Sequence, residues 1–172
     1  ERGIAVTNVP AYSTNSVAQL TFALVLEYYS KVGAYSAGVT SGEWTSSPDF
    51  CVLSRQIYEL TGKTIGIIGR GAIGSAVARI AEAFGLRVLF GSIPGREAAD
   101  KVPLRELLPL CDIVSLHCPL TAETSKIVNR DFLSQMRRDA ILVNTSRGGL
   151  VDEAALAGAL HELTIAHALL DV

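Results

Sequence analysis

Cysteine, methionine and aromatic residues are scarce in this chain of 172 residues, and its positive and negative charges nearly balance. The three cysteines are an odd number at unrelated spacings, which excludes a disulfide framework, so we expect no metal site and a reduced, cytoplasmic compartment. A net charge of −2 gives no electrostatic basis for binding nucleic acid or an anionic membrane. The apolar runs fall short of the roughly 20 residues of a membrane helix, and no signal-peptide pattern opens the sequence.

The two ends of the sequence are unusual for a complete protein. The only methionine is Met136, so an initiator is absent, and the chain stops just after the apolar segment 165–170. We therefore expect an excised domain or a partial sequence. The mean hydropathy of +0.33 agrees, because it predicts apolar surface that a partner or a further domain would cover.

Glycines 69, 71 and 74 have the G-x-G-x-x-G spacing of dinucleotide-binding sites. They follow the apolar run 65–68, which predicts a buried strand, and they open the helix-compatible segment up to residue 84. Strand, glycine turn and helix together would place a pyrophosphate at a helix N-terminus. We expect Gly69 to allow the sharp turn, Gly71 to let the phosphates approach and Gly74 to allow close helix–strand packing. The alternative is a glycine-rich turn that binds no ligand.

From residue 59 onward, short apolar strands alternate with helical segments, which predicts an α/β fold with a doubly wound parallel sheet, a Rossmann-type NAD(P)-binding domain. The expected strands are 64–68, 86–90, 112–116, 140–143 and 165–170, and the expected helices are 72–84, 104–108, 129–136 and 152–163, the last capped by Asp152.

The first 32 residues predict a short strand over 4–6, a turn over 8–10 and a helix over about 16–31. Thr14 or Asn15 is expected to cap this helix, and its nearly continuous apolar surface suits burial between two domains.

Residues 33–58 break this periodicity, because they are rich in Ser, Thr and Gly but also carry Trp44, Phe50 and Tyr58. A structureless segment of this length is improbable inside a compact domain. Aromatic anchors suit interfaces, so we predict a dimerisation arm that reaches a second subunit of a homodimer. A flexible linker with incidental aromatic residues is the alternative.

Ligands of doubly wound sheets bind beyond the carboxyl ends of the strands. In this sequence those positions hold glycine or polar residues rather than the apolar residues of the strands themselves. They are residues 69–74, Gly91 with Ser92, residues 117–119 (His117, Cys118 and Pro119), residues 144–149, and Asp171.

Ser92 stands near the place where an acidic residue normally binds the ribose of NAD. A serine with Arg96 nearby could accept the 2′-phosphate of NADP, which a carboxylate would repel. NADP binding and an NAD site that holds the ribose through backbone groups both remain open.

Arg147 is the strongest catalytic candidate, because it follows a strand end and is flanked by Gly148 and Gly149. The arginine fork can hold a carboxylate by two parallel hydrogen bonds, which suits an acid substrate. The alternative is an Arg147 paired to Asp152. His117 is interpreted as a cofactor-wall or structural residue rather than a catalytic one.

His161 and His167 are interpreted as structural. Asp112 and Asp139 fall at strand starts, the wrong end of the sheet for the site.

The whole chain resembles the nucleotide-binding domain of the D-isomer-specific 2-hydroxyacid dehydrogenases. The motifs that carry the resemblance are Asn8-Val-Pro-Ala-Tyr-Ser13 with Ser16-Val-Ala18, Gly62 to Gly74, Ser115-Leu-His-Cys-Pro-Leu-Thr121 with Thr124, Asn144 to Glu153, and Leu169-Leu-Asp-Val172. The block from Asn144 to Glu153 is the most specific of them.

The resemblance implies a role for each site residue. The loop Gly69–Gly74 would hold the pyrophosphate through the backbone of Ala72 and Ile73, although the family often has Arg where Ala72 stands, and Arg70 lies two residues earlier. Pro119 and Thr124 would line the adenosine half, Thr145 and Ser146 would face the nicotinamide, and Asp171 would bind its carboxamide. Arg147 would bind the carboxylate and 2-oxo group of a 2-oxo or 2-hydroxy acid.

The resemblance also implies parts that this sequence lacks. Residues 1–32 would be the interdomain segment, 33–58 the dimer arm and 59–172 the Rossmann core, whereas the substrate domain would precede residue 1. The family's catalytic histidine, in a His-x-Gly-Gly segment, would lie beyond Val172, so we expect the chain alone to be inactive. The alternatives are a dinucleotide-sensing module like the corepressors related to this family and a dimerisation domain with a degenerate site.

Overall fold

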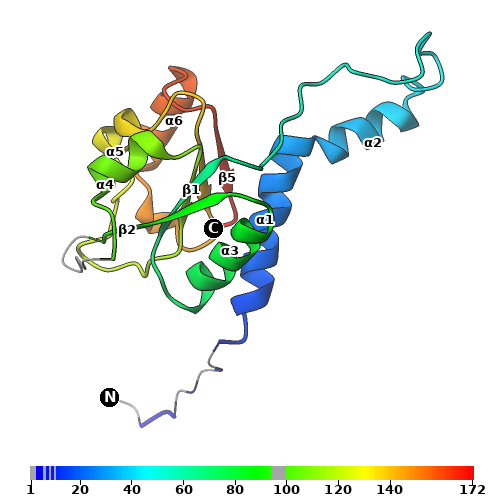
Figure 1. Ribbon diagram of the computed structural model, residues 1–172. Helices are drawn as coiled ribbons and strands as arrows, with labels where there is room; N and C mark the ends of the chain where they lie inside the picture. Colours follow the sequence, from blue (N-terminus) through cyan, green and yellow to red (C-terminus); the bar gives the residue numbers. More distant parts are fainter. Residues whose placement is uncertain (1–2, 6, 8, 10, 94–99) are drawn as a thin grey trace.

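The chain was analysed as a computed structural model, which describes residues 3–5, 7, 9, 11–93 and 100–172. Within these residues one parallel sheet forms with the strand order β2-β1-β3-β4-β5 (Figure 1). The strands are β1 (Thr64–Ile68), β2 (Arg87–Gly91), β3 (Ile113–Leu116), β4 (Ile141–Asn144) and β5 (His167–Leu170). The chain runs outward from β1 to β2 and then crosses to β3 on the other side, so the order reverses beside β1. The predicted doubly wound sheet is confirmed.

Helices cover both faces of this sheet (Figure 1). The helices are α1 (Thr14–Ser30), α2 (Val32–Thr40), α3 (Ala72–Ala83), α4 (Leu104–Leu107), α5 (Arg130–Gln135) and α6 (Glu153–His161), with short 3-10 turns at Leu108–Leu110 and Gly148–Leu150. One apolar cluster joins the sheet to α1 and α3, and a second joins it to α4, α5 and α6. Because both faces are covered, most residues of the strands are apolar, and apolar and polar residues do not alternate along them.

Local signals in the sequence explain where several helices begin and end. The Asp152 carboxylate accepts a hydrogen bond of 3.2 Å from the Ala155 N–H, which confirms the predicted cap of α6. Asn129 caps α5 in the same way, because its Oδ1 accepts a bond of 3.0 Å from the Phe132 N–H. Gly85, with a φ of +75°, provides the left-handed residue after the end of α3.

The beginning of the chain differs from the prediction. Residues 3–5 do not form a strand, because an extended segment needs a partner for its backbone groups and the described part of the sheet has its edges elsewhere. Val6, Asn8 and Pro10 lie outside the described residues, as does Arg96. Helix α1 begins at Thr14 rather than near residue 16, and its N-cap residue is Ser13, which makes no side-chain capping bond.

The stretch 33–58, whose periodicity is broken in the sequence, begins with a helix that was not predicted, because α2 occupies Val32–Thr40. Lys31 has a left-handed φ of 55° and separates α1 from α2. The Glu27 carboxylate accepts bonds of 3.0 and 3.2 Å from the Gly33 N–H, so it satisfies a donor at the start of α2. Tertiary contacts thus stabilise a helix that its two glycines disfavour.

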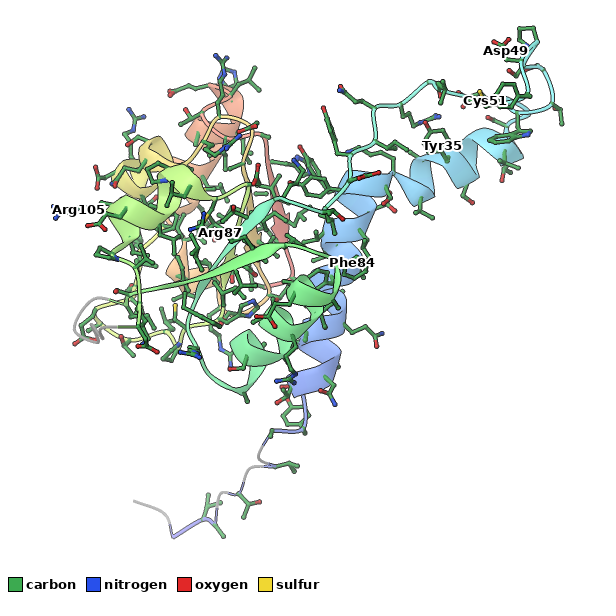
Figure 2. All side chains as sticks on the ribbon, in the orientation of Figure 1. Tyr35, Asp49, Cys51, Phe84, Arg87 and Arg105 are labelled. Carbon is green, nitrogen blue, oxygen red and sulfur yellow. The ribbon has the colours of Figure 1, made fainter. Side chains whose placement is uncertain are left out.

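The segment from α2 to residue 57, named the arm below, extends away from the sheet (Figure 1). Figure 2 shows Tyr35 on α2 and Asp49 and Cys51 in the loop beyond it, all far from the core. No helix in the described ranges has the length and apolar character needed to cross a membrane.

Candidate functional site

The register of the sheet brings the predicted site segments to one edge. Ile68 at the end of β1 is paired with Gly91 of β2 and with Leu116 of β3. Leu116 is paired in turn with Asn144 of β4, and Asn144 with Leu170 of β5. The segments that follow these residues therefore leave the sheet side by side. They lie at the carboxyl edge, next to the point where the strand order reverses, which is the ligand position in such folds.

The three glycines of the turn after β1 meet different surroundings. A Cβ atom on Gly69, whose φ is +109°, would lie 2.4 Å from the His117 carbonyl oxygen. A Cβ atom on Gly74 would lie 2.0 Å from the Gly69 carbonyl oxygen. These two glycines are thus required by the packing of the protein itself, whereas Gly71 has open space, because no atom lies within 4 Å of its Cβ position.

The space beside Gly71 fits a phosphate group. Gly71 is the N-cap residue of α3 and no side chain caps this helix. The first N–H groups of a helix have no acceptor within the helix, and the helix dipole is positive at this end. Ala72 is exposed and Ile73 is half-buried, so their backbone lies at the surface where a pyrophosphate would sit.

Arg70 points toward β2 rather than over the helix N-terminus. Its guanidinium lies 4.7 Å from the ring centre of Phe90 in β2 and forms an ion pair with Asp100. Ser92, just past the end of β2, is buried with 8% of its surface exposed. Asp100 thus partly balances the positive charge of Arg70, at the place where a ribose 2′ group would be expected.

The segment after β3 contributes to the candidate site mostly through its backbone and its shape. His117 Nε2 is hydrogen-bonded to the Ser115 hydroxyl at 2.8 Å, and burial lowers the pKa of His117 to about 4. Cys118 is in the apolar core, where burial raises the pKa of its thiol. Pro119 is exposed. The buried Thr124 hydroxyl donates to the Pro119 carbonyl at 2.6 Å, so it holds this loop in shape.

The loop after β4 is held by the buried side chain of Asn144. Its Nδ2 donates to the Arg147 carbonyl at 2.9 Å, and its Oδ1 accepts from the Ser146 N–H at 3.0 Å. The Asp171 N–H donates to the Asn144 carbonyl at 3.0 Å, which brings the end of β5 beside this loop. Sequence reasoning placed Asn144 at a strand end but did not identify this positioning function. The signal available in the sequence was that Asn144 is a polar residue at the end of an apolar strand.

Arg147 is exposed at this edge, and its Nη1 donates to the Ser146 carbonyl at 2.6 Å. The alternative pairing with Asp152 is not what the structure has, because Asp152 pairs instead with Lys126 at 3.5 Å and caps α6. The Ser146 hydroxyl donates to the Cys118 carbonyl at 3.1 Å, so the loops after β3 and β4 are joined directly.

Sequence reasoning missed a buried contact between this loop and α1. The Thr21 and Thr145 hydroxyls lie 2.9 Å apart, with exposed fractions of 0% and 8%. Thr21 is 124 positions away in the sequence, and a threonine in an apolar helix gives no signal of such a partner.

His161, His167 and Asp112 lie away from this edge. His167 begins β5 and stacks on Tyr28 with ring centres 5.3 Å apart. His161 ends α6, ahead of β5. Asp112 accepts a bond of 2.8 Å from the Thr64 N–H at the start of β1, so it lies at the amino edge as expected. Among the described residues no group of three or more His, Cys, Asp or Glu is arranged to hold a metal ion.

Comparisons with known proteins agree with this geometry. The chain is 42% identical over 177 residues to the hydroxypyruvate reductase of Blautia hydrogenotrophica, covering 100% of this chain and 55% of that protein. It is 41% identical over 172 residues to the glycerate dehydrogenase of Methylorubrum extorquens, covering 99% and 54%. A solved pyruvate reductase of Chlamydomonas reinhardtii superposes with a TM-score of 0.82 at 35% identity, covering 96% of this chain and 49% of that one.

The chain thus spans about half the length of the relatives it matches. Residues 22–172 match the sequence model described as D-isomer specific 2-hydroxyacid dehydrogenase, NAD binding domain. With the parallel sheet, the open glycine turn and the Asn144–Arg147 loop at one edge, this match shows that the chain belongs to the D-isomer-specific 2-hydroxyacid dehydrogenases and is their NAD-binding domain.

Proposed function

We propose that this chain is the cofactor domain of an NAD(P)-dependent oxidoreductase that interconverts a D-2-hydroxy acid and its 2-oxo acid. The observation that carries the proposal is Arg147. Its side chain is exposed, and the Asn144 amide at the end of β4 holds its backbone carbonyl. In the sheet, β4 lies next to β3, and β3 lies next to β1, which leads into the glycine turn. A cofactor domain without substrate chemistry has no need of an anchored arginine at this edge. The proposed substrate resembles those for which the relatives are named, hydroxypyruvate and glycerate.

In the proposed reaction the bound nicotinamide supplies or accepts a hydride. Arg147 binds the substrate carboxylate and 2-oxo oxygen, because its fork donates parallel hydrogen bonds to oxygen atoms. Its Nη1 already donates to the Ser146 carbonyl, which limits the directions of the remaining donors. Thr145 and Ser146 would lie beside a bound nicotinamide, and Asp171 would accept a hydrogen bond from its carboxamide.

The proton donor is not provided by the histidines of this chain. His117 is neutral at physiological pH, because burial lowers its pKa to about 4, and Ser115 holds its Nε2. His161 and His167 lie away from the carboxyl edge. General acid–base help accounts for roughly 10²–10⁴-fold in rate. We therefore propose that the chain alone binds cofactor and turns over 2-oxo acids negligibly.

Two measurements test whether the chain alone binds the cofactor and whether it turns over 2-oxo acids. Calorimetric titration of the chain with NADH should show saturable binding, and NADH oxidation with hydroxypyruvate, glyoxylate or pyruvate should stay at the background rate. The reading frame extended on both sides should restore oxidation, with the Arg147→Ala variant as the control. Robust turnover by the chain alone would contradict the proposal, as would an extended protein that is inactive with every acid.

Both dinucleotides are proposed to bind. Ser92 is uncharged, so it does not repel a 2′-phosphate, and Arg70 lies at the same end of the sheet with its charge partly balanced by Asp100. Titrations with NAD and NADP should give affinities within tenfold of one another. An affinity for NAD more than tenfold above that for NADP would refute dual binding.

The alternative of a dinucleotide-sensing corepressor is not supported. The relatives described above are named as reductases or dehydrogenases, and the role proposed for Arg147 involves a substrate that a sensor does not bind.

The arm is proposed to cover a second copy of the chain in a homodimer. It leaves the sheet as an extension (Figure 1), and its large apolar side chains are exposed: Val39 55%, Trp44 49%, Phe50 96%, Leu53 84% and Ile57 55%. Such a surface is typical of an interface. The arm is also braced internally, because Tyr35 Oη donates to the Arg55 carbonyl at 2.9 Å and Arg55 pairs with Glu43 at 3.1 Å.

Light scattering coupled to size-exclusion chromatography tests this assembly. The wild-type chain should elute with twice the monomer mass, and the Phe50→Asp, Leu53→Asp variant should elute as a monomer with an unchanged circular dichroism spectrum. A monomeric wild-type chain at micromolar concentration would contradict the homodimer. Asp49→Ser is a matched control, since it alters the same exposed loop without changing its apolar surface.

A further inference from the structure

The pair Thr21–Thr145 connects α1 to the loop that carries Arg147. The two hydroxyl oxygens are 2.9 Å apart, and Thr21 has no exposed surface. A fully buried hydroxyl in an apolar helix is maintained only when its hydrogen bonds are satisfied. Thr21 therefore contacts the loop that carries Arg147, but it is too deeply buried to contact a ligand bound at this loop.

The direction of the protons in this pair follows from the number of donors. The Thr21 hydroxyl donates to the Val17 carbonyl at 2.9 Å, and a carbonyl oxygen can only accept. Each threonine hydroxyl has a single proton. Both contacts of Thr21 are hydrogen bonds at the same time only if the proton between the two residues is that of Thr145, so that the chain of donors runs from Thr145 to Thr21 to the Val17 carbonyl.

This direction determines what Thr145 presents at the edge of the sheet. Its proton points inward to Thr21, so its remaining lone pairs are available only as acceptors. A neighbouring ligand group must then bring an N–H or O–H donor. In a nicotinamide dinucleotide the part proposed to lie at this loop is the nicotinamide, whose carboxamide NH₂ is a donor, whereas the diphosphate is placed at Gly71.

We propose that Thr21 is a positioning residue that fixes the Thr145 hydroxyl as an acceptor and thereby favours binding of the nicotinamide end of the cofactor. The inference rests on the proposed function, because it needs the nicotinamide at the loop after β4. Without the acceptor at position 21, the Thr145 proton would turn to another partner. If the Thr145 hydroxyl pointed its proton at the carboxamide NH₂, two donors would face each other and the contact would be weaker.

Four single variants and one double variant of the chain, titrated calorimetrically with NADH and with ADP-ribose, test this role. Thr21→Val keeps the shape but removes the acceptor, Thr21→Ser restores the hydroxyl, and Thr145→Val removes the donor. Val25→Ala is the control for packing, because Val25 is fully buried one turn further along α1 and has an apolar side chain. ADP-ribose lacks the nicotinamide and so reports only on the rest of the site.

Thr21→Val is expected to weaken NADH about tenfold, the effect of a lost or reversed hydrogen bond, and to change ADP-ribose by less than twofold. Thr21→Ser should bind both ligands like wild type, and Val25→Ala should lower the unfolding temperature without changing either affinity. Thr145→Val should weaken NADH similarly, and the double variant Thr21→Val, Thr145→Val should be no weaker than either single one, because the two hydroxyls act as one unit.

Two results would overturn the positioning role. One is equal weakening of NADH and ADP-ribose by Thr21→Val, which indicates a general structural change. The other is an NADH affinity in Thr21→Val equal to that of wild type. Failure of the proposed function itself would look different. The wild-type chain would then bind neither NADH nor ADP-ribose, or the extended protein would be inactive with every acid, and neither result depends on position 21.

Discussion

Alanine substitutions at three glycines should separate folding from cofactor binding in this chain. Gly74 lies in the first turn of α3, where a Cβ atom would be 2.0 Å from the Gly69 carbonyl oxygen. At Gly71 and at Gly158 in α6, no atom lies within 4 Å of the added Cβ. The same methyl group therefore meets backbone at Gly74, the proposed phosphate site at Gly71 and open space at Gly158.

The magnitudes follow from these distances. Gly74→Ala must separate two backbone segments by about 1 Å to restore even a 3.0 Å contact, and overpacking of this kind costs about 1–3 kcal/mol. For a chain of this size each kcal/mol lowers the unfolding temperature by about 2–4 °C, so a decrease of about 2–12 °C is expected. Gly158→Ala should raise it by up to about 4 °C, because alanine is favoured over glycine in a helix by about 1 kcal/mol.

Gly71→Ala should leave folding intact and weaken the cofactor. Its φ of −88° is accessible to alanine, so the unfolding temperature should stay within about 2 °C of wild type. The added methyl group occupies the space left for the pyrophosphate, and a loss of about 1.4 kcal/mol would weaken NADH tenfold.

Thermal unfolding followed by circular dichroism, together with calorimetric titration of NADH, measures both effects in the same preparations. Gly158→Ala is the control, since it should bind NADH like the wild type. The reasoning is refuted if Gly71→Ala binds NADH as tightly as the wild type, or if Gly74→Ala unfolds at the wild-type temperature.

Three further predictions concern single side chains. In the extended protein, whose activity is proposed above, Arg147→Lys should lower kcat/KM by about 10–150-fold, since charged hydrogen bonds contribute about 1.5–3 kcal/mol. A change below threefold in steady-state assays would exclude substrate binding by Arg147. The pKa of His117 falls to about 4 in the folded chain, so the unfolded state binds more protons between about pH 4 and 6.5. Stability should therefore decrease as the pH falls through this window, by about 2–3 kcal/mol more than in His117→Gln, and parallel pH profiles from urea unfolding would contradict this. Burial raises the pKa of Cys111 to about 12 and also raises that of Cys118, so a thiol reagent at pH 8 should label Cys51 first and the other two only on unfolding; equal labelling rates in native protein would disprove it.

The local sequence was sufficient for the elements of the Rossmann core. Strand β1 was predicted with its observed bounds, and α3, α5 and α6 within about two residues of theirs, because apolar runs, cap residues and glycine turns act over a few residues. The segments of the candidate site could be named for the same reason, since parallel strands place their carboxyl ends at one edge. The short strand expected over residues 4–6 is absent at residues 4 and 5, because pairing with another strand, which local sequence does not report, decides whether an apolar run becomes a strand.

Only the tertiary structure decided which side chains act together at that edge. The Asn144 amide holds the Arg147 loop, Arg70 lies against Phe90 and Asp100, and Thr21 meets Thr145 from 124 positions away. Such contacts depend on strand order, register and helix placement, and no pattern along the chain contains these. The sequence by itself therefore determined the fold and the edge proposed for ligand binding, whereas the packing of α1 and the register of the strands determined how the residues of this candidate site are held.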